Sequence, residues 1–376
     1  MLFQEVIGHD EIKARLVESV TKEAVPHAQM FTGPEGCGTF PMAMAYAQYL
    51  LCTNRTANDS CGTCPSCVKV STLQHPDMHF SFPGLSAGGG GKSVADVYLS
   101  QWREMVQSNP YFNVKDWRNE LVAENKQLLL GVDEAENILK KLSLSAYAGG
   151  YKVMLIWLPE LMNVAAANKL LKQLEEPNPG TVFIMICEDT EQLLATIISR
   201  MQTVKFPAVK EQLLAQNLSE RYQVDEATAL NIAHFSEGNV NAAMHYVQND
   251  FTDASHFNLL VEWMRACYNY DVSKLVPLAE VFHKTGRESQ KEFYEYALHF
   301  VRQCIVANYG QDELSRFTPE EAKFAVKFSP FINHLNVVDL AETIELAHRD
   351  IGRNVYARIV MLHCSYQIHK LLRRAD

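Results

Sequence analysis

The chain has 376 residues, 47% of them hydrophobic and 21% charged, so it is long enough for two or three domains with cores of their own. Its formal net charge of -10 argues against a protein that holds nucleic acid mainly through its own positive charge. The N-terminal sequence lacks the basic start and apolar core of a signal peptide, and no apolar run approaches the roughly 18 residues of a transmembrane helix. We therefore expect a cytoplasmic protein that works through protein partners and keeps its cysteines reduced.

The first motif in the chain is a glycine loop between a predicted strand and a predicted helix. Ala28–Thr32 is a short apolar run, and the sequence after the loop is rich in Ala, Met and Leu. Between them, "FTGPEGCGTF" has the spacing G-x-x-x-x-G of a phosphate-binding loop at Gly33 and Gly38. The next two positions should be Lys and Ser or Thr, but they are Thr39 and Phe40.

A cluster of cysteines follows the predicted helix. Cys52, Cys61, Cys64 and Cys67 lie within a stretch of 16 residues, and the C-x2-C-x2-C end of the stretch can present thiolates to one ion. Four thiolates with no open position are typical of a structural zinc site, and we expect Zn²⁺ here. An iron–sulfur cluster would require a similar set of ligands, but "GTCPSC" resembles a zinc knuckle more.

Several other potential ligands are not expected to bind the ion. Four sulfur atoms complete a tetrahedral shell, so His75 and His79 are interpreted as bystanders. The remaining five cysteines lie in apolar surroundings and are expected in the core: Cys37, Cys187, Cys267, Cys304 and Cys364.

The stretch Gly84–Asn125 is hard to assign from the sequence. It contains four consecutive glycines, the sequence "GGGGKS" and two tryptophans. The first glycine that a second phosphate loop would need, six residues before Lys92, is Ser86. We interpret the stretch as a flexible surface linker.

Two further apolar runs, Val153–Leu158 and Val182–Cys187, are typical of buried parallel strands, and a strong helix former separates them. Alternating strands and helices up to about Phe206 indicate an α/β domain with a parallel sheet. From Glu211 onward only helical periodicity is found. It includes two apolar stripes, one at Phe293, Ala297, Phe300, Val301 and Cys304, and one at Val355, Ile359, Leu362 and Tyr366.

In combination, these motifs resemble a known family. "VIGHDEIKARL", "VPHAQMFTGPEGCG", the cysteine knuckle, "AAANKLLKQLEEP" and "LLATIISRMQ" occur in this order. They resemble the bacterial clamp-loader subunits of the AAA+ superfamily, and among these the delta-prime family of DNA polymerase III. The resemblance implies an AAA+ P-loop-type domain with the zinc module at 52–67 over residues 1–206, a helical lid over 207–250 and an all-α collar over 251–376.

Compared with that family, the parts needed for ATP hydrolysis are missing. Thr39 and Phe40 cannot neutralise phosphate charge or hold Mg²⁺ as Lys and Ser/Thr do. Trp157 and Leu158 stand where the family has Asp-Glu, and Asn241 or Ala242 stands where the lid has an arginine. The backbone of Gly33, Gly36, Gly38 and Thr39 could still bind a phosphate or sulfate weakly, and this alternative stays open.

One residue keeps a potential role in the family's chemistry. "TIISRM" resembles the Ser-Arg-Cys motif, so Ser199 and Arg200 match the residues that present an arginine finger to ATP on a neighbouring subunit. Out of this context an ordinary surface arginine would be a sufficient account. The segment with Lys172, Glu175 and Glu176 lies near the subunit interface in the family, although an intrahelical ion pair also explains these residues.

We therefore expect a subunit that does not hydrolyse ATP itself and needs no catalytic nucleotide. Its expected partners are the gamma/tau-like ATPase and delta-like subunits of the clamp loader and, through the assembly, the sliding clamp and primer–template DNA. Two alternatives remain: an active gamma/tau-type ATPase subunit, and a stand-alone zinc-containing nucleic-acid-binding protein. The first needs the missing catalytic residues, and the second conflicts with the acidic composition.

Overall fold

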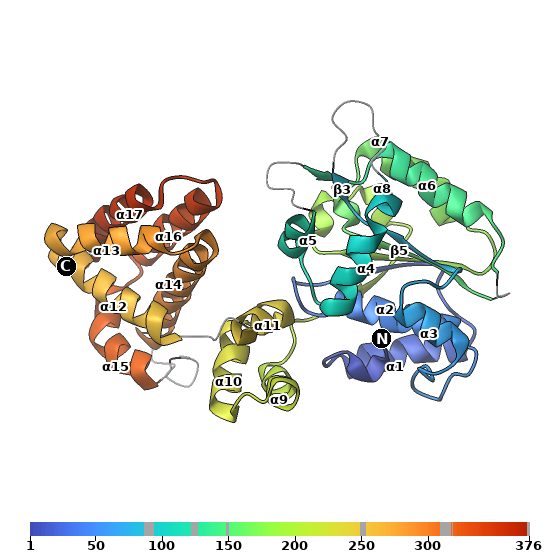
Figure 1. Cartoon of the computed structure of the whole chain (residues 1–376), viewed down its shortest axis with the longest axis horizontal. Coiled ribbons are helices and arrows are strands. Elements are labelled where there is room, and N and C mark those ends of the chain that lie inside the picture. The colour runs from blue at the N-terminus through green and yellow to red at the C-terminus, as the bar shows by residue number, and fades with distance from the viewer. Residues whose placement is uncertain are drawn as a thin grey trace. The chain divides into compact units, whose positions relative to one another are not determined.

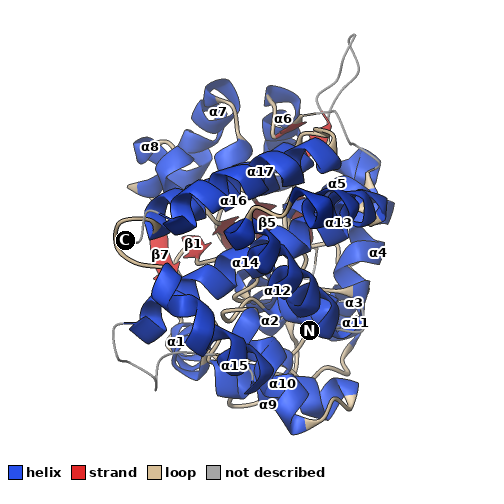
Figure 2. Cartoon of the chain, turned by 90° about the vertical axis from the view of Figure 1, so that its left-hand side faces the viewer, coloured by secondary structure: helices blue, strands red, loops and turns tan. Residues whose placement is uncertain are grey.

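The computed structural model of the chain describes residues 1–85, 94–121, 127–147, 150–248, 253–308, 317 and 319–373. These residues form two compact units, Met1–Gln248 and Asn249–Asp376 (Figure 1). Helices predominate, and every strand of the described part belongs to the first unit (Figure 2). None of the helices found in the described ranges is both long enough and apolar enough to span a membrane.

The first unit is built on a five-stranded sheet with the strand order β2-β5-β6-β1-β7. All four strand pairings in it are parallel. Its strands are β1 (Ala28–Thr32), β2 (Met78–Ser81), β5 (Lys152–Trp157), β6 (Thr181–Cys187) and β7 (Gln202–Lys205). A separate antiparallel pair joins β3 (Gly84–Leu85) to β4 (Leu128–Leu129). The predicted α/β class with a parallel sheet is thus confirmed.

Both faces of this sheet are buried, because side chains of successive strand residues enter different cores. In β5, Val153, Leu155 and Trp157 enter one core, and Met154 and Ile156 enter the other. The first core contains residues of α1 (Asp10–Thr21), α2 (Thr39–Leu51) and α3 (Pro65–Ser71). The second contains residues of α6 (Val132–Ser143), α7 (Val164–Glu175) and α8 (Ala195–Ile198), which lie on the opposite side of the sheet (Figure 1).

Three helices complete the first unit: α9 (Glu211–Tyr222), α10 (Glu226–Phe235) and α11 (Val240–Gln248). Short 3-10 helices lie at Phe3–Glu5, Ala95–Tyr98, Pro159–Leu161 and Thr190–Gln192. Because α9–α11 belong to the same compact unit as the sheet, the division of residues 1–250 at position 206 stays a prediction.

In its described residues, the second unit contains only helices. They are α12 (Asp253–Asn269), α13 (Val272–Lys284), α14 (Arg287–Asn308), α15 (Pro319–Phe328), the 3-10 helix Ser329–Phe331, α16 (Val337–Gly352) and α17 (Ala357–Leu372). The apolar stripe predicted on α14 is confirmed as a core face, since its five residues are all buried.

The second apolar stripe, at Val355, Ile359, Leu362 and Tyr366, does not form the buried face of its helix. Val355, Ile359 and Tyr366 are exposed, with Ile359 at 61%. The helix instead buries a different face, which includes Val360, Cys364 and other residues at helical spacing. The sequence carries apolar residues on two faces of α17, and periodicity alone does not tell which face the neighbouring helices cover.

The prediction of a flexible linker over Gly84–Asn125 is wrong for the part that the structure describes. Residues 95–120 contain α4 (Leu99–Ser108) and α5 (Val114–Glu120), which place Trp102 and Trp117 fully inside the first core. The two buried tryptophans hold this segment in the core, which the glycine-rich start of the stretch does not indicate. The sequence "GGGGKS" and residues 122–126 lie outside the described residues.

Candidate functional site

The four predicted metal ligands come together at one point beside α3. Their sulfur atoms all lie within 4.8 Å of one another. Cys52 Sγ is 3.6 Å from Cys61 Sγ and 3.9 Å from Cys64 Sγ, and Cys61 Sγ is 3.9 Å from Cys67 Sγ. Sulfur atoms on a tetrahedron with metal–sulfur bonds of about 2.3 Å would be about 3.8 Å apart. The cluster therefore has the size and the donor set to hold a metal ion.

The backbone around the cluster is arranged to stabilise negative sulfur atoms. The N–H groups of Cys61, Cys64 and Cys67 donate to the sulfur atoms of Cys52, Cys61 and Cys64, respectively, at 3.3–3.4 Å. Burial alone would raise the pKa of Cys64, but hydrogen bonds from Thr53 and from the Cys67 N–H outweigh it and lower that pKa to about 5. Metal ligation requires the thiolate, so this environment favours it.

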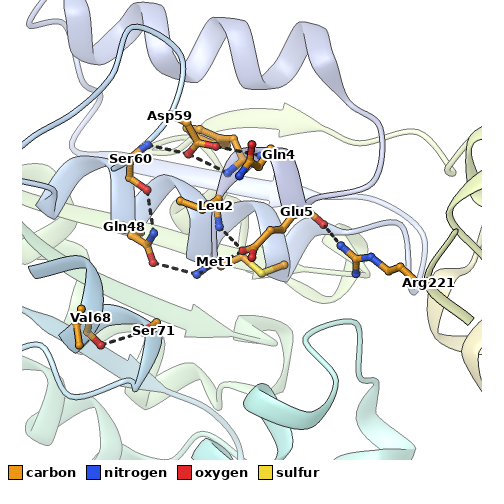
Figure 3. Close-up of polar contacts among 11 residues, drawn as sticks. Met1, Leu2, Gln4, Glu5, Gln48, Asp59, Ser60, Val68, Ser71 and Arg221 are labelled. Atoms are coloured by element: carbon orange, nitrogen blue, oxygen red, sulfur yellow. Dashed lines mark hydrogen bonds and ion pairs between the residues drawn. The ribbon is translucent and has the colours of Figure 1, made fainter. Parts of the chain in front are cut away.

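The loop between the first two cysteines is tied to the N-terminal segment. The Asp59 carboxylate accepts hydrogen bonds from the backbone N–H groups of Phe3 at 3.0 Å and Gln4 at 3.1 Å (Figure 3). Next to it, the Gln48 side chain of α2 donates to Ser60 Oγ at 2.8 Å. These contacts fix the loop on the body of the first unit, so the cysteine module is part of its fold.

The other five cysteines and the two histidines are not part of this four-cysteine group. The five other cysteines are buried. His75 is also buried, and its Nε2 lies 3.3 Å from Ser66 Oγ. Within the described residues, the four-cysteine group is the only cluster of this kind.

The predicted glycine loop connects β1 to α2, as a phosphate loop does. Gly36 has a φ of 68° and Gly38, the residue before α2, a φ of 102°. A Cβ atom at Gly36 would lie 1.8 Å from Asn239 Oδ1, and one at Gly33 would lie 2.6 Å from the Phe206 carbonyl oxygen. The glycines therefore allow other atoms to come close to the loop backbone, and in this chain those atoms belong to Asn239 and Phe206.

Four aromatic rings pack together next to the end of the glycine loop. Phe40 and Trp157, which the resemblance sets against a Ser/Thr and an Asp of the family, both contact Phe112, at centroid distances of 4.8 Å and 4.9 Å. Trp102 contacts Phe40 at 5.6 Å and Trp157 at 5.3 Å. We call these four buried residues the aromatic cluster. Its rings offer no oxygen ligand for Mg²⁺, which prefers oxygen.

The surroundings of the loop also disfavour an anion. Glu188, directly after β6, is partly buried, and the charges of Glu35 in the loop and of Glu160 act on it. Burial, together with the charges of Glu35 and Glu160, raises the pKa of Glu188 to about 7. A phosphate at the loop would add negative charge beside these carboxylates.

Asn241, one of the two residues that match the missing lid arginine, is only 1% exposed. Its Oδ1 accepts from Asn109 Nδ2 at 2.6 Å, and its Nδ2 donates to Asp116 Oδ2 at 2.8 Å. Both partners lie in the segment that the sequence left unassigned. In the sequence, only the two tryptophans of this segment indicate that it packs against the rest of the unit.

Ser199 and Arg200 follow α8 and lie apart from the aromatic cluster. The Arg200 Nε donates to Glu175 Oε1 at 2.7 Å and its Nη1 donates to the Thr196 carbonyl oxygen at 2.6 Å. Arg200 is partly exposed, so its guanidinium can be reached from outside the chain. Of the residues considered at the end of α7, Glu175 is thus the one that contacts Arg200.

The fold and the glycine loop define an α/β protein with a parallel sheet and a P-loop-type strand–loop–helix unit, a helix-rich C-terminal part and a cysteine cluster. The family model described as "DNA polymerase III, delta subunit" matches residues 8–210, and the chain belongs to this clamp-loader family. The resemblance seen in the ordered motifs is thereby confirmed.

Individual relatives agree with this assignment. The chain is 28% identical over 236 residues to DNA polymerase III subunit delta' of Escherichia coli, covering 63% of this chain and 59% of that one. It is 27% identical over 235 residues to subunit delta' of Bacillus subtilis, covering 62% and 58%. It is 26% identical over 247 residues to subunit tau of B. subtilis, covering 64% and 36%. The matches thus span about three fifths of these delta' relatives and about a third of tau.

A solved structure of a gamma-subunit-related protein of DNA polymerase III from Thermotoga maritima is similar over 96% of this chain and 99% of that one. The sequence identity is 14% and the TM-score 0.40.

Proposed function

We propose that this chain is a delta-prime-type subunit of a bacterial clamp loader, which helps to load a sliding clamp on primed DNA without hydrolysing ATP itself. The observation that carries the proposal is the aromatic cluster, where Phe40 and Trp157 occupy the positions of two metal ligands. Without Mg²⁺ and a phosphate-binding lysine, the charge on a transferring phosphoryl group has no stabilisation at this site.

This proposal favours the delta-prime type over the gamma/tau type, although relatives of both types match the chain. A gamma/tau-type motor must bind and hydrolyse ATP at its own loop. Here the loop faces packed rings and the carboxylates of Glu35 and Glu188. By the same proposal, the chain has no polymerase chemistry of its own and acts as one component of a DNA polymerase III holoenzyme.

The proposed contribution of this chain to ATP hydrolysis is made to the active site of a neighbouring subunit. Arg200 is partly exposed, and among the residues that the structure describes its ion pair is with Glu175. We assign it the role of an arginine finger for ATP on a neighbouring gamma/tau-like subunit, with Ser199 beside it. Such a finger contributes about 10³–10⁵ to the rate in other phosphoryl-transfer systems.

The cysteine cluster is assigned to Zn²⁺ in a structural role. Cys52, Cys61, Cys64 and Cys67 would hold the ion with four sulfur ligands and no open position, and the sulfur spacing fits metal–sulfur bonds of about 2.3 Å. The ion would stabilise the loop that Asp59 ties to the N-terminal segment.

The experiment that tests the function is the DNA-stimulated ATPase activity of a clamp loader reconstituted from this chain and the ATPase and delta-like subunits of the same organism. The chain is supplied as wild type, as Arg200→Ala, or as Arg221→Ala, a matched control that removes an exposed arginine of α9. Assembly is verified by gel filtration before rates are compared. We expect a fall of about 10³ or more with Arg200→Ala only.

ATP turnover by the isolated chain is measured in parallel. We expect none above background, because its own loop lacks the catalytic groups. Steady turnover by the isolated chain would support a motor subunit instead. An unchanged ATPase rate with Arg200→Ala in an intact assembly would rule out Arg200 as an arginine finger. The chain would then contribute only a structural role to the assembly.

A further inference from the structure

The segment 95–120, which we call the inserted segment, lies across the glycine loop and is fixed firmly in the first unit. Trp102 stacks on Phe82 with ring centroids 4.0 Å apart, and Trp117 donates from Nε1 to the Pro83 carbonyl oxygen at 2.7 Å. At its start, the backbone N–H of Ala95 donates to Glu134 Oε2 at 2.7 Å. The segment is thus part of the core and carries its polar groups in defined positions.

One set of these polar groups holds the glycine loop. Asn113 Nδ2 donates to Glu35 Oε1 at 2.9 Å, and Asn239, just before α11, donates to the same oxygen at 3.3 Å. Tyr111 lies beside Gly38 and accepts a hydrogen bond from the Ile7 N–H at 2.9 Å. Loop, inserted segment and the N-terminal residues therefore share one network.

A second set holds α11. Asn241 is the centre, because it accepts from Asn109 and donates to Asp116. Asp116 Oδ1 also lies 3.3 Å from His245 Nε2, one turn further along α11. The loop and α11 meet directly as well, through the Val240 N–H and the Gly36 carbonyl oxygen at 3.0 Å.

These contacts resist opening because breaking them leaves polar groups without partners in a buried place. Asn241 is 1% exposed and Asn113 8% exposed. A buried amide that loses its partners keeps its desolvation cost, whereas an exposed one regains hydrogen bonds from water. Helix α11 therefore has one strongly favoured position relative to the loop.

We propose that the inserted segment is a built-in occupant of the nucleotide site, which latches α11 to the glycine loop in place of a bound nucleotide. In lid-bearing enzymes the ligand supplies the contacts that close the lid over the site. Here Asn109, Asn113 and Asp116 supply them permanently, so the lid helices stay closed whether or not nucleotide is present. This inference concerns the chain alone and does not depend on Arg200 or on any partner.

The test is hydrogen–deuterium exchange of the full-length chain, followed at α11 and, for reference, at β5 and β6. Asn241→Ala removes both side-chain contacts at the centre of the latch. We expect exchange in α11 to become about 10-fold faster or more, while β5 and β6 stay protected. Addition of Mg²⁺–ATP to the wild-type chain is expected to leave exchange in α11 unchanged.

Asn137→Ala is the matched control. It also removes an asparagine amide that contacts the inserted segment, through Asp96 at 3.1 Å, but it is far from α11 in the network. Exchange in α11 should not respond to it. If Asn241→Ala proves insoluble, Asn109→Ala removes one of the two contacts of Asn241 from the segment side and must also speed exchange selectively in α11.

Two results would overturn the latch. One is that α11 is equally protected from exchange in the wild type and in whichever of Asn241→Ala and Asn109→Ala is soluble. The other is extra protection of α11 when Mg²⁺–ATP is added to the wild type, since a nucleotide would then be the closing ligand.

Discussion

Arg200 and Glu175 form an ion pair in which one carboxylate oxygen receives two donors from the same guanidinium. Nε donates to Glu175 Oε1 at 2.7 Å, and Nη2 donates to the same oxygen. The pair joins Arg200, the second residue after α8, to the last turn of α7. It keeps the guanidinium on the surface in a defined orientation while the chain is alone.

We expect this pair to be a resting position that releases Arg200 easily. Both side chains are partly exposed, with Glu175 at 47%, and such pairs are worth about 0–1 kcal/mol. Glu175→Gln should change the free energy of unfolding by less than about 1 kcal/mol and the ATPase rate of the reconstituted assembly by less than about 5-fold. Chemical denaturation and the ATPase assay measure the two effects. A loss as large as with Arg200→Ala would instead make Glu175 essential for placing the finger.

The cysteine cluster makes a prediction about metal content. We expect about one zinc ion per purified chain by plasma mass spectrometry, and almost none in Cys64→Ser. Loss of the metal should also loosen the N-terminal segment, because Asp59 binds Phe3 and Gln4 from the same loop. Faster amide exchange at residues 3–5 would report this.

Cys187→Ala provides the control for the metal experiment, since Cys187 is a buried cysteine of β6 outside the cluster. It should keep its zinc. Full metal content in Cys64→Ser would contradict the four-sulfur site, and iron in place of zinc would change the identity of the metal.

Restoring the sequence of the phosphate loop should not restore the site. Thr39→Lys/Phe40→Ser supplies the two expected loop residues, but Phe112 and Trp157 still pack against each other and offer no oxygen ligand for Mg²⁺. The double variant should hydrolyse no ATP, and loss of the buried Phe40 ring should lower the free energy of unfolding by about 3–5 kcal/mol.

Thr39→Lys alone separates the added charge from the lost ring, and we expect it to cost less than about 1 kcal/mol because Thr39 is only partly buried. Urea denaturation measures both variants. ATP hydrolysis by the double variant would mean that the rings move aside easily, which the packing described above does not allow.

Glu188 makes the stability of the chain depend on pH in a predictable direction. Burial raises the pKa of Glu188 from its ordinary value of 4.5 to about 7, so between these two pH values the folded chain binds a proton here that the unfolded chain has already lost. Below about pH 4.5 Glu188 is protonated in both states, so its burial does not lower the free energy of unfolding. As the pH rises from there, the free energy of unfolding falls, and the full loss is reached above about pH 7. Glu188→Gln should stabilise the chain by about 1–3 kcal/mol at pH 8 and little at pH 5.

Glu191→Gln, which changes an exposed carboxylate in the nearby 3-10 helix Thr190–Gln192, is the control and should show no such difference between the two pH values. Denaturation at pH 5 and pH 8 gives the comparison. An equal effect of Glu188→Gln at both values would contradict the raised pKa.

The parts of this fold that were predictable from the sequence are those whose signal is local. The strands β5 and β6 were predicted to within one residue at each end, because a strand buried on both faces reads as a continuous apolar run. The four cysteines were found together because their spacing is itself the signal.

What the sequence could not predict depends on contacts between distant residues. Phe40, Phe112 and Trp157 come from three separate parts of the chain, and none of their local patterns indicates that their rings meet. Similarly, Asn241 has no local feature that points to Asn109 or Asp116, which precede it by more than 100 residues.

The aromatic cluster also bears on how such a subunit could change over generations. A single replacement of Trp157 by Asp, or of Phe40 by Ser, would place a polar group among the remaining rings and leave space beside it, which costs several kcal/mol before any activity is gained. Recovery of hydrolysis would need several substitutions at once. Under the proposed function, a chain without ATPase activity would therefore tend to stay without it, and selection would act on how well it serves its partner subunits.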